Sequence, residues 1–439
     1  MPTDYLEVDA DYKDRKTRAT FWVKSFEVDE DYLTATDAKG EPVLVRMPCE
    51  EGRDFQIRQR ISSARNYVAP IINKYVSSVF RRYPSRTDTV YVEELKESLS
   101  GGLQGFMSRA LLDALVTGRV AIVPTVNDEG LLSLRAFDDR DILRVVRNDD
   151  YEVVEVLLLT TFDAVAQEGK ARVYRETTYQ DITFKGHPEK AKVVDTSEEV
   201  SHEMPGMPVA FMEPVHGSSF VRPIVNSQVK IINMLSILSV EIVDNTFTRF
   251  VISGVDDLAR TDMLPDGQER QAPSVWSTKR LMTFSEENVH VHSMAADATQ
   301  AESIRKSVSE EEEHLSRNSG VGASYNIQSG GEQSGLSRLV QLEDFVLYAN
   351  GMISAVEDAE NHLLSLITPA EVFVPTVYSR DVLDQEWEEE VQRIRDLRDL
   401  GLVDDRVLTY MVNHLIDSVV ELPDDLVDIL NDTETNPEP

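Results

Sequence analysis

The sequence contains a single cysteine, Cys49, among 439 residues. One thiol cannot build an intramolecular disulfide framework, so we expect the protein to fold in a reducing compartment. The N-terminal stretch MPTDYLEVDADYKDRK is too polar for a secretory signal. No segment approaches the ~18 continuous apolar residues that a membrane span requires. These absences predict a soluble, intracellular protein with no membrane partner.

Positive charge is also scarce. Lys and Arg number 44 against 78 Asp and Glu, which gives a formal net charge of −34 and a pI near 4.6. Because phosphate binding rests on clustered cations, general attraction to nucleic acid is not expected. Copies of so acidic a chain also repel one another. An oligomer must therefore rely on buried apolar contacts or on local pairing of opposite charges.

The sequence lacks the motifs of the common nucleotide-binding, hydrolytic and metal-binding enzymes. No GxGxxG, GxxxxGK(S/T), HExxH or GxSxG pattern and no spaced Cys/His set occurs. His290 and His292 alternate on an expected strand, and Glu310–Glu313 is followed by His314, but neither group has a further ligand at motif spacing. An acidic run on a helix is usually a solvated face. We predict no catalytic residue, no metal and no cofactor.

The most distinctive segment is Arg317–Gly335, RNSGVGASYNIQSGGEQSG, which carries five glycines and few large apolar side chains. It cannot bury enough apolar surface to offset the entropy of ordering it. The expected helix before it, Asp297–Leu315, is acidic with a narrow apolar stripe. The expected helix after it, Ser337–Ile367, has apolar residues at helical spacing. The pattern indicates a mobile segment mounted on a helical frame.

The N-terminal part combines expected strands with a basic helical segment. Ala19–Phe26 and Pro42–Met47 have the pattern of strands. Asp54–Arg82 has helical spacing, and Pro70 is expected to bend or divide this helix. Its arginines indicate either a contact with an acidic neighbour, a second copy included, or a solvated helix face, and the sequence leaves these two alternatives equal. The candidates for the contact are Arg58, Arg65, Arg81 and Arg82.

The next region alternates between helix and strand patterns, which indicates an α+β unit. A short amphipathic helix is expected at Gly105–Thr117, and the charged stretch His187–Met204 is expected to loop over the surface. Strands are expected at Arg119–Val126, Leu132–Phe137, Ile142–Arg147, Glu152–Thr160 and Ala171–Thr183.

A long helix follows, and a small turn-rich insert separates it from the acidic helix. Serines and Pro223 are the start signal for a helix over Pro223–Phe250. Short strands in the insert are expected at Ser274–Thr278, Arg280–Phe284 and Val289–His292. The elements expected after the second long helix are a strand at Ala370–Arg380, helices at Asp384–Leu400 and Asp404–Val419, and an acidic tail that is disordered beyond Asn431.

Four segments, in this order, carry a family resemblance. They are NYVAPIINKYVSSVFRRYP at Asn66–Pro84, GRVAIVP at Gly118–Pro124, GMPVAFMEPVHGSSFVRPIVN at Gly206–Asn226 and GGEQSGLSRLV at Gly330–Val340. Taken in that order, these segments look like the early wing helix, a wing strand, the turn that opens the first stem helix, and the end of the tunnel loop in the portal proteins of tailed bacteriophages. The chain resembles that family over roughly residues 55–420, and the order of the motifs carries the resemblance.

The resemblance implies an α+β portal fold, with a mixed α/β wing, a two-helix stem, a small α/β clip, a long wing helix after a tunnel loop, and a helical crown. An N-terminal acidic β-containing arm at 1–53 and an acidic tail at 423–439 lie outside it. The implied segments are the wing at 54–221, stem helix 1 at 222–250, the clip at 251–296, stem helix 2 at 297–316, the tunnel loop at 317–335, the long wing helix at 336–368, and a strand with the helical crown at 369–422.

Members of this family form a homo-oligomeric ring, commonly of twelve copies, at one capsid vertex. DNA passes through the ring during packaging and ejection. The resemblance therefore implies a location in the virion, after assembly in the host cytoplasm. The implied partners are other copies of the chain, the terminase large subunit, major capsid and scaffolding proteins, head-completion or adaptor proteins, and double-stranded DNA held transiently and without base readout.

The resemblance also gives places to particular residues. An acidic stem would line the channel and repel the duplex, and the polar loop would touch DNA without holding it. The channel-lining candidates are Glu302, Glu310, Glu311, Glu312 and Glu313. The DNA-facing candidates in the tunnel loop are Asn318, Ser319, Ser324, Tyr325, Asn326 and Gln328.

Two other functions stay open at this point. A metal-dependent enzyme would use Glu310–His314 or the pair His290 and His292, and stoichiometric zinc or manganese would reveal it. An acidic virion adaptor or scaffold protein without a DNA channel would tolerate loss of Asn318–Ser334.

Overall fold

The computed structural model describes most of the first 380 residues. The residues described are 6–48, 50–86, 89–126, 130–202, 204–215, 219–246, 249–253, 262–263, 269–270, 290–294, 298–321, 335–370 and 372–380. Side chains are described in these ranges except within 243–298 and 335–343. The chain divides into two compact units after Val382, and the second, Leu383–Pro439, lies outside the described residues. The expected crown helices, the tail and the first two strands of the insert lie outside them as well.

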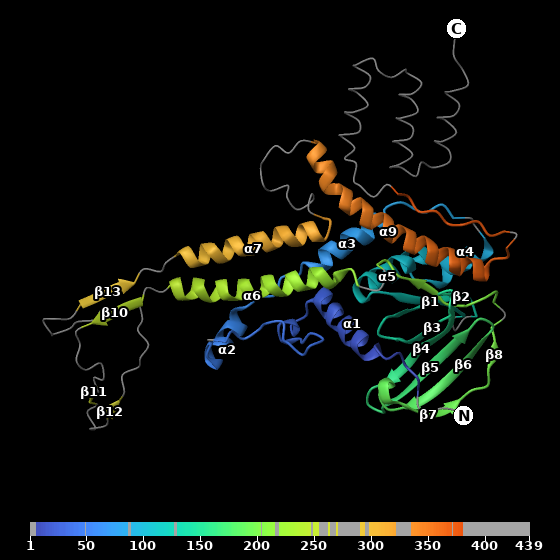
Figure 1. Cartoon of the computed structure of the whole chain (residues 1–439), viewed down its shortest axis with the longest axis horizontal. Helices are drawn as coiled ribbons and strands as arrows, with labels where there is room; N and C mark the ends of the chain where they lie inside the picture. Colours follow the sequence, from blue (N-terminus) through green and yellow to red (C-terminus); the bar gives the residue numbers. More distant parts are fainter. Residues whose placement is uncertain are drawn as a thin grey trace, which may run out of the picture. The chain divides into compact units, whose positions relative to one another are not determined.

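A helix, rather than a strand, opens the described chain. α1 spans Tyr12–Glu27 and buries Tyr12 and Ala19, which lie two helical turns apart (Figure 1). The strand expected at Ala19–Phe26 is therefore wrong. Its β-prone residues adopt a helix because α1 packs along α5, and tertiary packing overrides local preference.

The segment after α1 is held by a side chain rather than by a strand. Val45 N–H donates to Asn233 Oδ1 at 3.0 Å, and Asn233 Nδ2 donates to the Val43 carbonyl at 2.7 Å. One isolated bridge is the only β pairing among the described residues of this segment. The strand expected at Pro42–Met47 is therefore wrong, and the arm at 1–53 has no strand in its described part.

The basic segment divides into two helices, α2 at Gly52–Ile61 and α3 at Val68–Val79. A division was expected at Pro70, but the break lies before the proline. Pro70 is the third residue of α3, and the first turn of a helix has no intrahelical partner for its N–H groups. α3 buries an apolar stripe that includes Ile72 and Tyr75.

Two further helices cover a three-stranded antiparallel sheet with the order β2-β1-β9. α4 (Val90–Ser98) packs on β2, and α5 (Gly102–Thr117), which confirms the expected helix, packs on β1. The first five residues of β1 are buried. The strands are β1 (Val120–Val126), β2 (Leu132–Asp138) and β9 (Ala210–Met212).

A second antiparallel sheet has the order β3-β4-β5-β6-β7, with β8 paired to β6. The strand expected over Ala171–Thr183 is two strands, because a turn at residues 176–177 separates β5 from β6. The expected surface loop His187–Met204 contains β7 and β8, whose exposed polar residues make edge strands look like loop in the sequence. The strands are β3 (Ile142–Arg147), β4 (Val153–Asp163), β5 (Glu168–Arg175), β6 (Thr178–Lys185), β7 (Lys192–Thr196) and β8 (Val200–Ser201).

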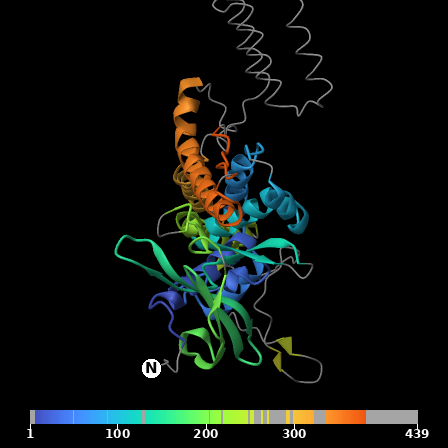
Figure 2. The same ribbon diagram turned by 90° about the vertical axis from the view of Figure 1, so that its right-hand side faces the viewer.

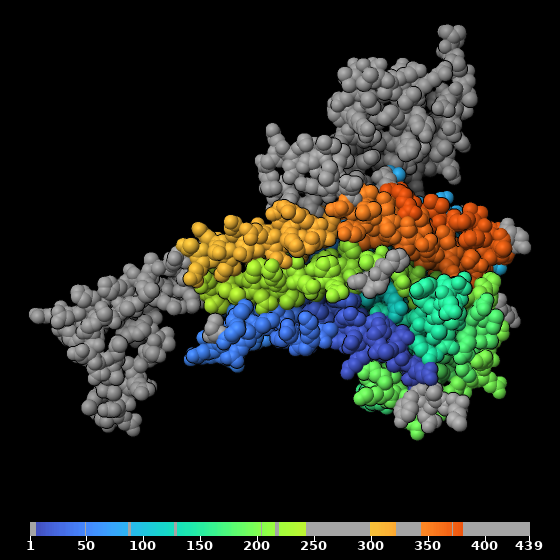
Figure 3. Space-filling view, in the orientation of Figure 1, coloured from blue at the N-terminus to red at the C-terminus, as the bar shows by residue number. Residues whose placement is uncertain are grey.

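Two long helices, α6 (Val221–Thr246) and α7 (Ala298–Asn318), run antiparallel and side by side (Figures 1 and 3). Pro223 is the third residue of α6, which agrees with the expected start signal. The expected helix continued to Phe250, but strand β10 already begins at Arg249. The helix therefore ends earlier than expected, at Thr246.

The described residues of the insert between α6 and α7 form two small antiparallel ladders. β10 (Arg249–Ser253) pairs with β13 (His290–Met294), which confirms the strand expected at Val289–His292. β11 (Asp262–Met263) pairs with β12 (Glu269–Arg270).

The longest described helix is α9, which spans Gly335–Ile367 and confirms the helix expected at Ser337–Ile367. The strand expected at Ala370–Arg380 is wrong, because its described part makes one isolated bridge and no ladder. The backbone N–H groups of Thr376 and Tyr378 donate to side chains of α9 instead. In both ribbon views, α9 and the six-stranded sheet lie on opposite sides of the central helices (Figures 1 and 2).

The fold class expected from the sequence, α+β, is confirmed by these helices and two main sheets. Among the described residues, one helical segment, Val221–Ile242, is long and apolar enough to cross a bilayer by length and composition alone. In the protein, α6 packs against α1, α2, α3 and α7.

Candidate functional site

The antiparallel pair α6 and α7 leads directly into the glycine-rich segment, and the seam between the two helices is the base of the candidate site. Val308 and Leu315, seven residues apart on α7, are buried. They lie on the narrow apolar stripe that the sequence predicts for this helix. The stripe fixes which of the other α7 residues face α6 and which face solvent, because each residue turns the helix by about 100°.

Two of the four consecutive glutamates of α7 are bound within the chain. Glu311 accepts hydrogen bonds from Lys230 and from Ser227, at 2.8 Å for the serine, both on α6. Glu312 accepts from the Tyr67 hydroxyl at 2.5 Å and lies 3.9 Å from Arg65. These two carboxylates therefore connect α7 to α6 and to the start of α3.

The pKa values of these groups reflect their partners. Burial would raise the pKa of Glu311, but the hydrogen bonds from Lys230 and Ser227 outweigh it and hold this pKa below its usual value. Burial and donation to Glu312 raise the pKa of Tyr67 to about 12. At neutral pH, Glu311 is therefore a charged acceptor and the Tyr67 hydroxyl a neutral donor.

The other acidic residues of α7 face solvent. Glu302 is exposed, and the side chains of Glu310 and Glu313 are 65% and 48% exposed. Glu310 lies 3.9 Å from Lys306, and Glu313 pairs with Arg317, in each case four residues along the same helix. Exposed pairs of this kind are screened and weak. Three of the five predicted channel-lining carboxylates are therefore exposed, and two of these lie beside exposed cations.

The glycine-rich segment begins at a buried hydrogen bond. The Tyr75 hydroxyl, on α3, donates to the Ser319 carbonyl at 2.6 Å, and Ser319 is 1% exposed. Gly320 follows with φ +69°, and a Cβ atom there would lie 2.7 Å from Tyr75 Oη. Only glycine fits both this backbone conformation and this space. The first residues after α7 are thus fixed in place.

Aromatic rings from three parts of the chain surround this bond. The Tyr75 ring stacks on Phe345 of α9, with centroids 4.7 Å apart, and meets Phe220 edge-on at 5.1 Å. Phe220 in turn contacts Tyr348 of α9 edge-on. Burial raises the pKa of Tyr75 far above its usual value, so its hydroxyl stays a donor. One tyrosine therefore ties together α3, the start of α6, the end of α7, and α9.

The predicted DNA-facing residues lie in different environments. Asn318 is exposed at the end of α7, where it contacts His314. Ser319 is buried, and its hydroxyl donates to the Ser316 carbonyl, so the prediction that it faces DNA is wrong. The remaining candidates, Ser324, Tyr325, Asn326 and Gln328, lie outside the described residues.

The four predicted interface arginines also differ. Arg58 is 2% exposed and donates to Glu50, to the Val45 carbonyl and to Ser236 on α6. Its guanidinium is used inside the chain, so it cannot be offered to another copy, and that prediction is wrong. Arg65 is mostly exposed near Glu312. Arg81 is exposed and Arg82 is half-buried, and both have partners.

A buried carboxylate that the sequence does not single out joins α9 to two distant segments. Glu360 is fully buried and accepts from the Arg86 guanidinium at 2.6 and 2.8 Å. The Tyr378 hydroxyl donates to it at 2.6 Å, and burial raises the pKa of this tyrosine. No motif spacing signals this cluster, since Arg86 lies 274 residues before Glu360 in the sequence. The one sequence feature that could have indicated this cluster is the position of Glu360 on the apolar stripe of the helix expected at Ser337–Ile367.

The structure gathers no metal-binding cluster in the part of the chain that it describes. No three His, Cys, Asp or Glu side chains converge there. His314 contacts Asn318 rather than the neighbouring glutamates. His290 and His292 lie on β13, two residues apart, which places them on one face of that strand.

Comparison with known proteins gives likenesses to solved structures alone, and the one described here is distant. No family model and no curated protein sequence matches the chain. Among solved structures, a chain from a structure described as the virion of a native gene transfer agent particle is similar, with a TM-score of 0.42 and 14% identity over 87% of this chain and 94% of that chain. With a likeness this distant, function has to be inferred from the residues of this chain.

Proposed function

We propose that this chain is a portal protein. It forms a homo-oligomeric ring, of twelve copies in the commonest arrangement, at one capsid vertex. DNA is packaged and ejected through the ring, and the terminase large subunit and later the head-completion or tail proteins dock on it. Major capsid and scaffolding proteins surround it, after assembly in the host cytoplasm. The proposal assigns the chain no catalytic residue and no cofactor.

The observation that carries this proposal is the helix pair with its two ends. α6 and α7 run antiparallel, a β insert joins them at one end, and the other end leads into the glycine-rich segment and the 33-residue helix α9. This succession supports assigning α6 and α7 to a stem, the insert to a clip, and residues 317–335 to a tunnel loop.

The charge of α7 supports a conduit rather than a clamp. Glu302, Glu310 and Glu313 are exposed on a helix whose opposite side is held to α6. Carboxylates within a Debye length, about 8 Å at physiological salt, repel phosphates. The five glutamates of α7 outnumber its cations, Arg305, Lys306 and Arg317, so a channel lined by this helix would not hold the phosphates tightly.

The experiment that tests the proposal shortens the tunnel loop without disturbing its anchor. A variant in which a short glycine linker replaces residues 322–334 keeps Tyr75, Ser319 and Gly320. We expect it to assemble into rings as the wild type does and to package much less DNA. A matched control replaces only the serines of the segment with alanine. Normal packaging by the shortened variant would favour an acidic virion adaptor without a channel.

A further inference from the structure

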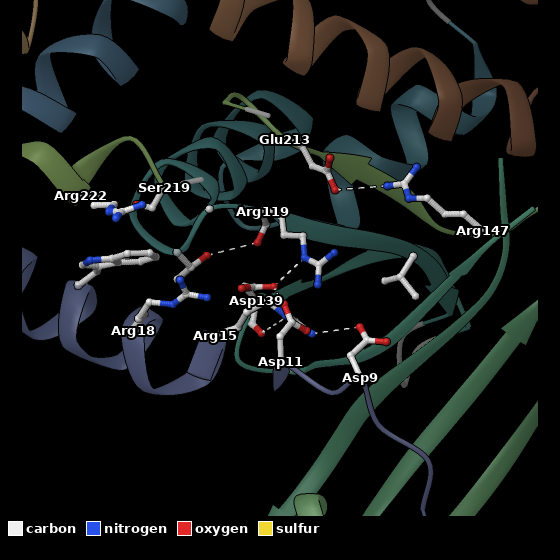
Figure 4. Close-up of a pocket in the computed structure, with 14 residues that line it drawn as sticks. Asp9, Asp11, Arg15, Arg18, Arg119, Asp139, Arg147, Glu213, Ser219 and Arg222 are labelled. Carbon is white, nitrogen blue, oxygen red and sulfur yellow. Dashed lines mark hydrogen bonds and ion pairs between the residues drawn. The ribbon is translucent and has the colours of Figure 1, made fainter. Parts of the chain in front are cut away.

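A cavity of about 380 Å³ lies away from the helix-pair seam, at the junction of α1, the end of β3 and the start of α6 (Figure 4). Five arginines line it, together with four carboxylates and one tryptophan, Trp22. On a chain with net charge −34, a concentration of arginines of this kind is unusual. We therefore asked which of these charges already have partners.

The charges in the middle of the cavity are paired. Arg15 donates to Asp139 at 2.6 Å and to Asp9 and Asp11 at 3.2 Å each. Arg119 donates to the same Asp139 at 2.6 Å. These groups neutralise one another and fix the shape of the cavity wall.

A third pair lies apart from this cluster. Arg147 lies 3.6 Å from Glu213, and Figure 4 shows the two together on the side of the view opposite Arg18 and Arg222. Every carboxylate of the cavity therefore has an arginine partner.

Two arginines in the same cavity have no carboxylate partner among the described residues. Arg18, on α1, is exposed, and its Nε donates to the Asp14 carbonyl. Arg222 is exposed in the first turn of α6. That end of a helix already carries partial positive charge, so a cation there is unfavourable unless an anion comes near. Together with Trp22, they form what we call the arginine mouth of the cavity.

We propose that the arginine mouth binds exposed carboxylate side chains of a second copy of this chain. The inference rests on the proposed ring, in which one surface of each copy meets a different surface of the next. The planar guanidinium groups of the arginine mouth can bind carboxylates bidentately, and Trp22 lines the same cavity. A chain with 78 Asp and Glu offers such carboxylates, and pairing would relieve the repulsion between its copies.

The first test reverses the charge of the mouth. We expect R18E/R222E to need a roughly tenfold or higher protein concentration than the wild type for half-assembly, measured by light scattering. The control K39E/K192E makes the same change in net charge at two exposed lysines outside the cavity and should assemble like the wild type. The neutral variant R18Q/R222Q should show the same direction of effect with a smaller fold-change. Thermal unfolding of the unassembled chains checks that each variant folds.

Assembly of both mouth variants at wild-type concentrations would overturn the inference and leave the proposed ring standing. A wild type that never assembles would instead refute the proposed function itself. A second measurement needs no variant. Phenylglyoxal should modify Arg18 and Arg222 in the unassembled chain and be excluded from both in the assembled form, read by mass spectrometry. Equal modification in the two forms would also overturn the inference.

Discussion

The hydrogen bond between Tyr75 and Ser319 makes a quantitative prediction about how the glycine-rich segment is anchored. Tyr75→Phe removes the donor and keeps the ring that stacks on Phe345. The Ser319 carbonyl is then buried without this partner, which is expected to cost about 1–3 kcal/mol of folding stability. The matched variant Tyr348→Phe, whose residue is 43% exposed, is expected to change stability by less than about 0.5 kcal/mol.

Substitution of the adjacent glycine tests the same anchor from the other side. Gly320→Ala forces a Cβ atom into a left-handed conformation, at about 1–2 kcal/mol, and brings it to 2.7 Å from Tyr75 Oη. Tyr75→Phe removes that closest atom. The double variant is therefore expected to cost less than the sum of the two single variants, by about 0.5 kcal/mol or more.

Urea denaturation of the unassembled chain measures all four variants on one scale, through the midpoint and the slope. Additive costs for Tyr75→Phe and Gly320→Ala would refute the contact between them. A Tyr75→Phe variant as stable as Tyr348→Phe would refute the claim that the hydroxyl is needed at the start of the segment.

Two further predictions concern buried charges. Glu360→Gln leaves the Arg86 guanidinium without its buried carboxylate and is expected to lower the free energy of unfolding, measured in urea, by about 3–5 kcal/mol. The control Glu313→Gln, whose ion pair is exposed, is expected to lower it by less than about 0.5 kcal/mol. Equal losses in the two variants would contradict this prediction. Burial, and then repulsion from Asp138, raises the pKa of Asp141 from its ordinary 3.8 to about 6. The folded chain therefore loses stability as the pH rises from 3.8 through 6. The free energy of unfolding of Asp141→Asn should exceed that of the wild type by about 2–3 kcal/mol at pH 8 and should equal it near pH 3. If Asp141→Asn were no more stable than the wild type at pH 8, the cost assigned to the buried Asp141 carboxylate would be contradicted.

Much of the fold could be predicted from the sequence because its long elements have strong periodicity. The apolar stripe over Ser337–Ile367 predicted α9, and the start signal at Pro223 predicted α6. The secondary-structure predictions that are wrong concern segments whose conformation depends on residues distant in the sequence. The segment Pro42–Met47 has strand-like residues, but Asn233 on α6 binds its Val45 N–H and its Val43 carbonyl. No local pattern reports such a partner.

The candidate site shows the same division. Glu310 to Glu313 are equivalent in the sequence, but helical rotation sends Glu311 and Glu312 to partners on α6 and α3 and leaves the first and last exposed. Ser319 has the polarity of a loop residue, and its burial depends on a tyrosine 244 positions earlier in the chain. Polarity predicts solvent contact only where no distant donor or acceptor satisfies the group.

The central claim, a ring that conducts DNA, is tested most directly by electron microscopy of the assembled protein together with its mass from light scattering. Twelve copies of a 49.5 kDa chain predict closed rings of about 0.6 MDa with an open centre. A chain that stays monomeric under every assembly condition, or that forms particles without a central channel, would contradict the account.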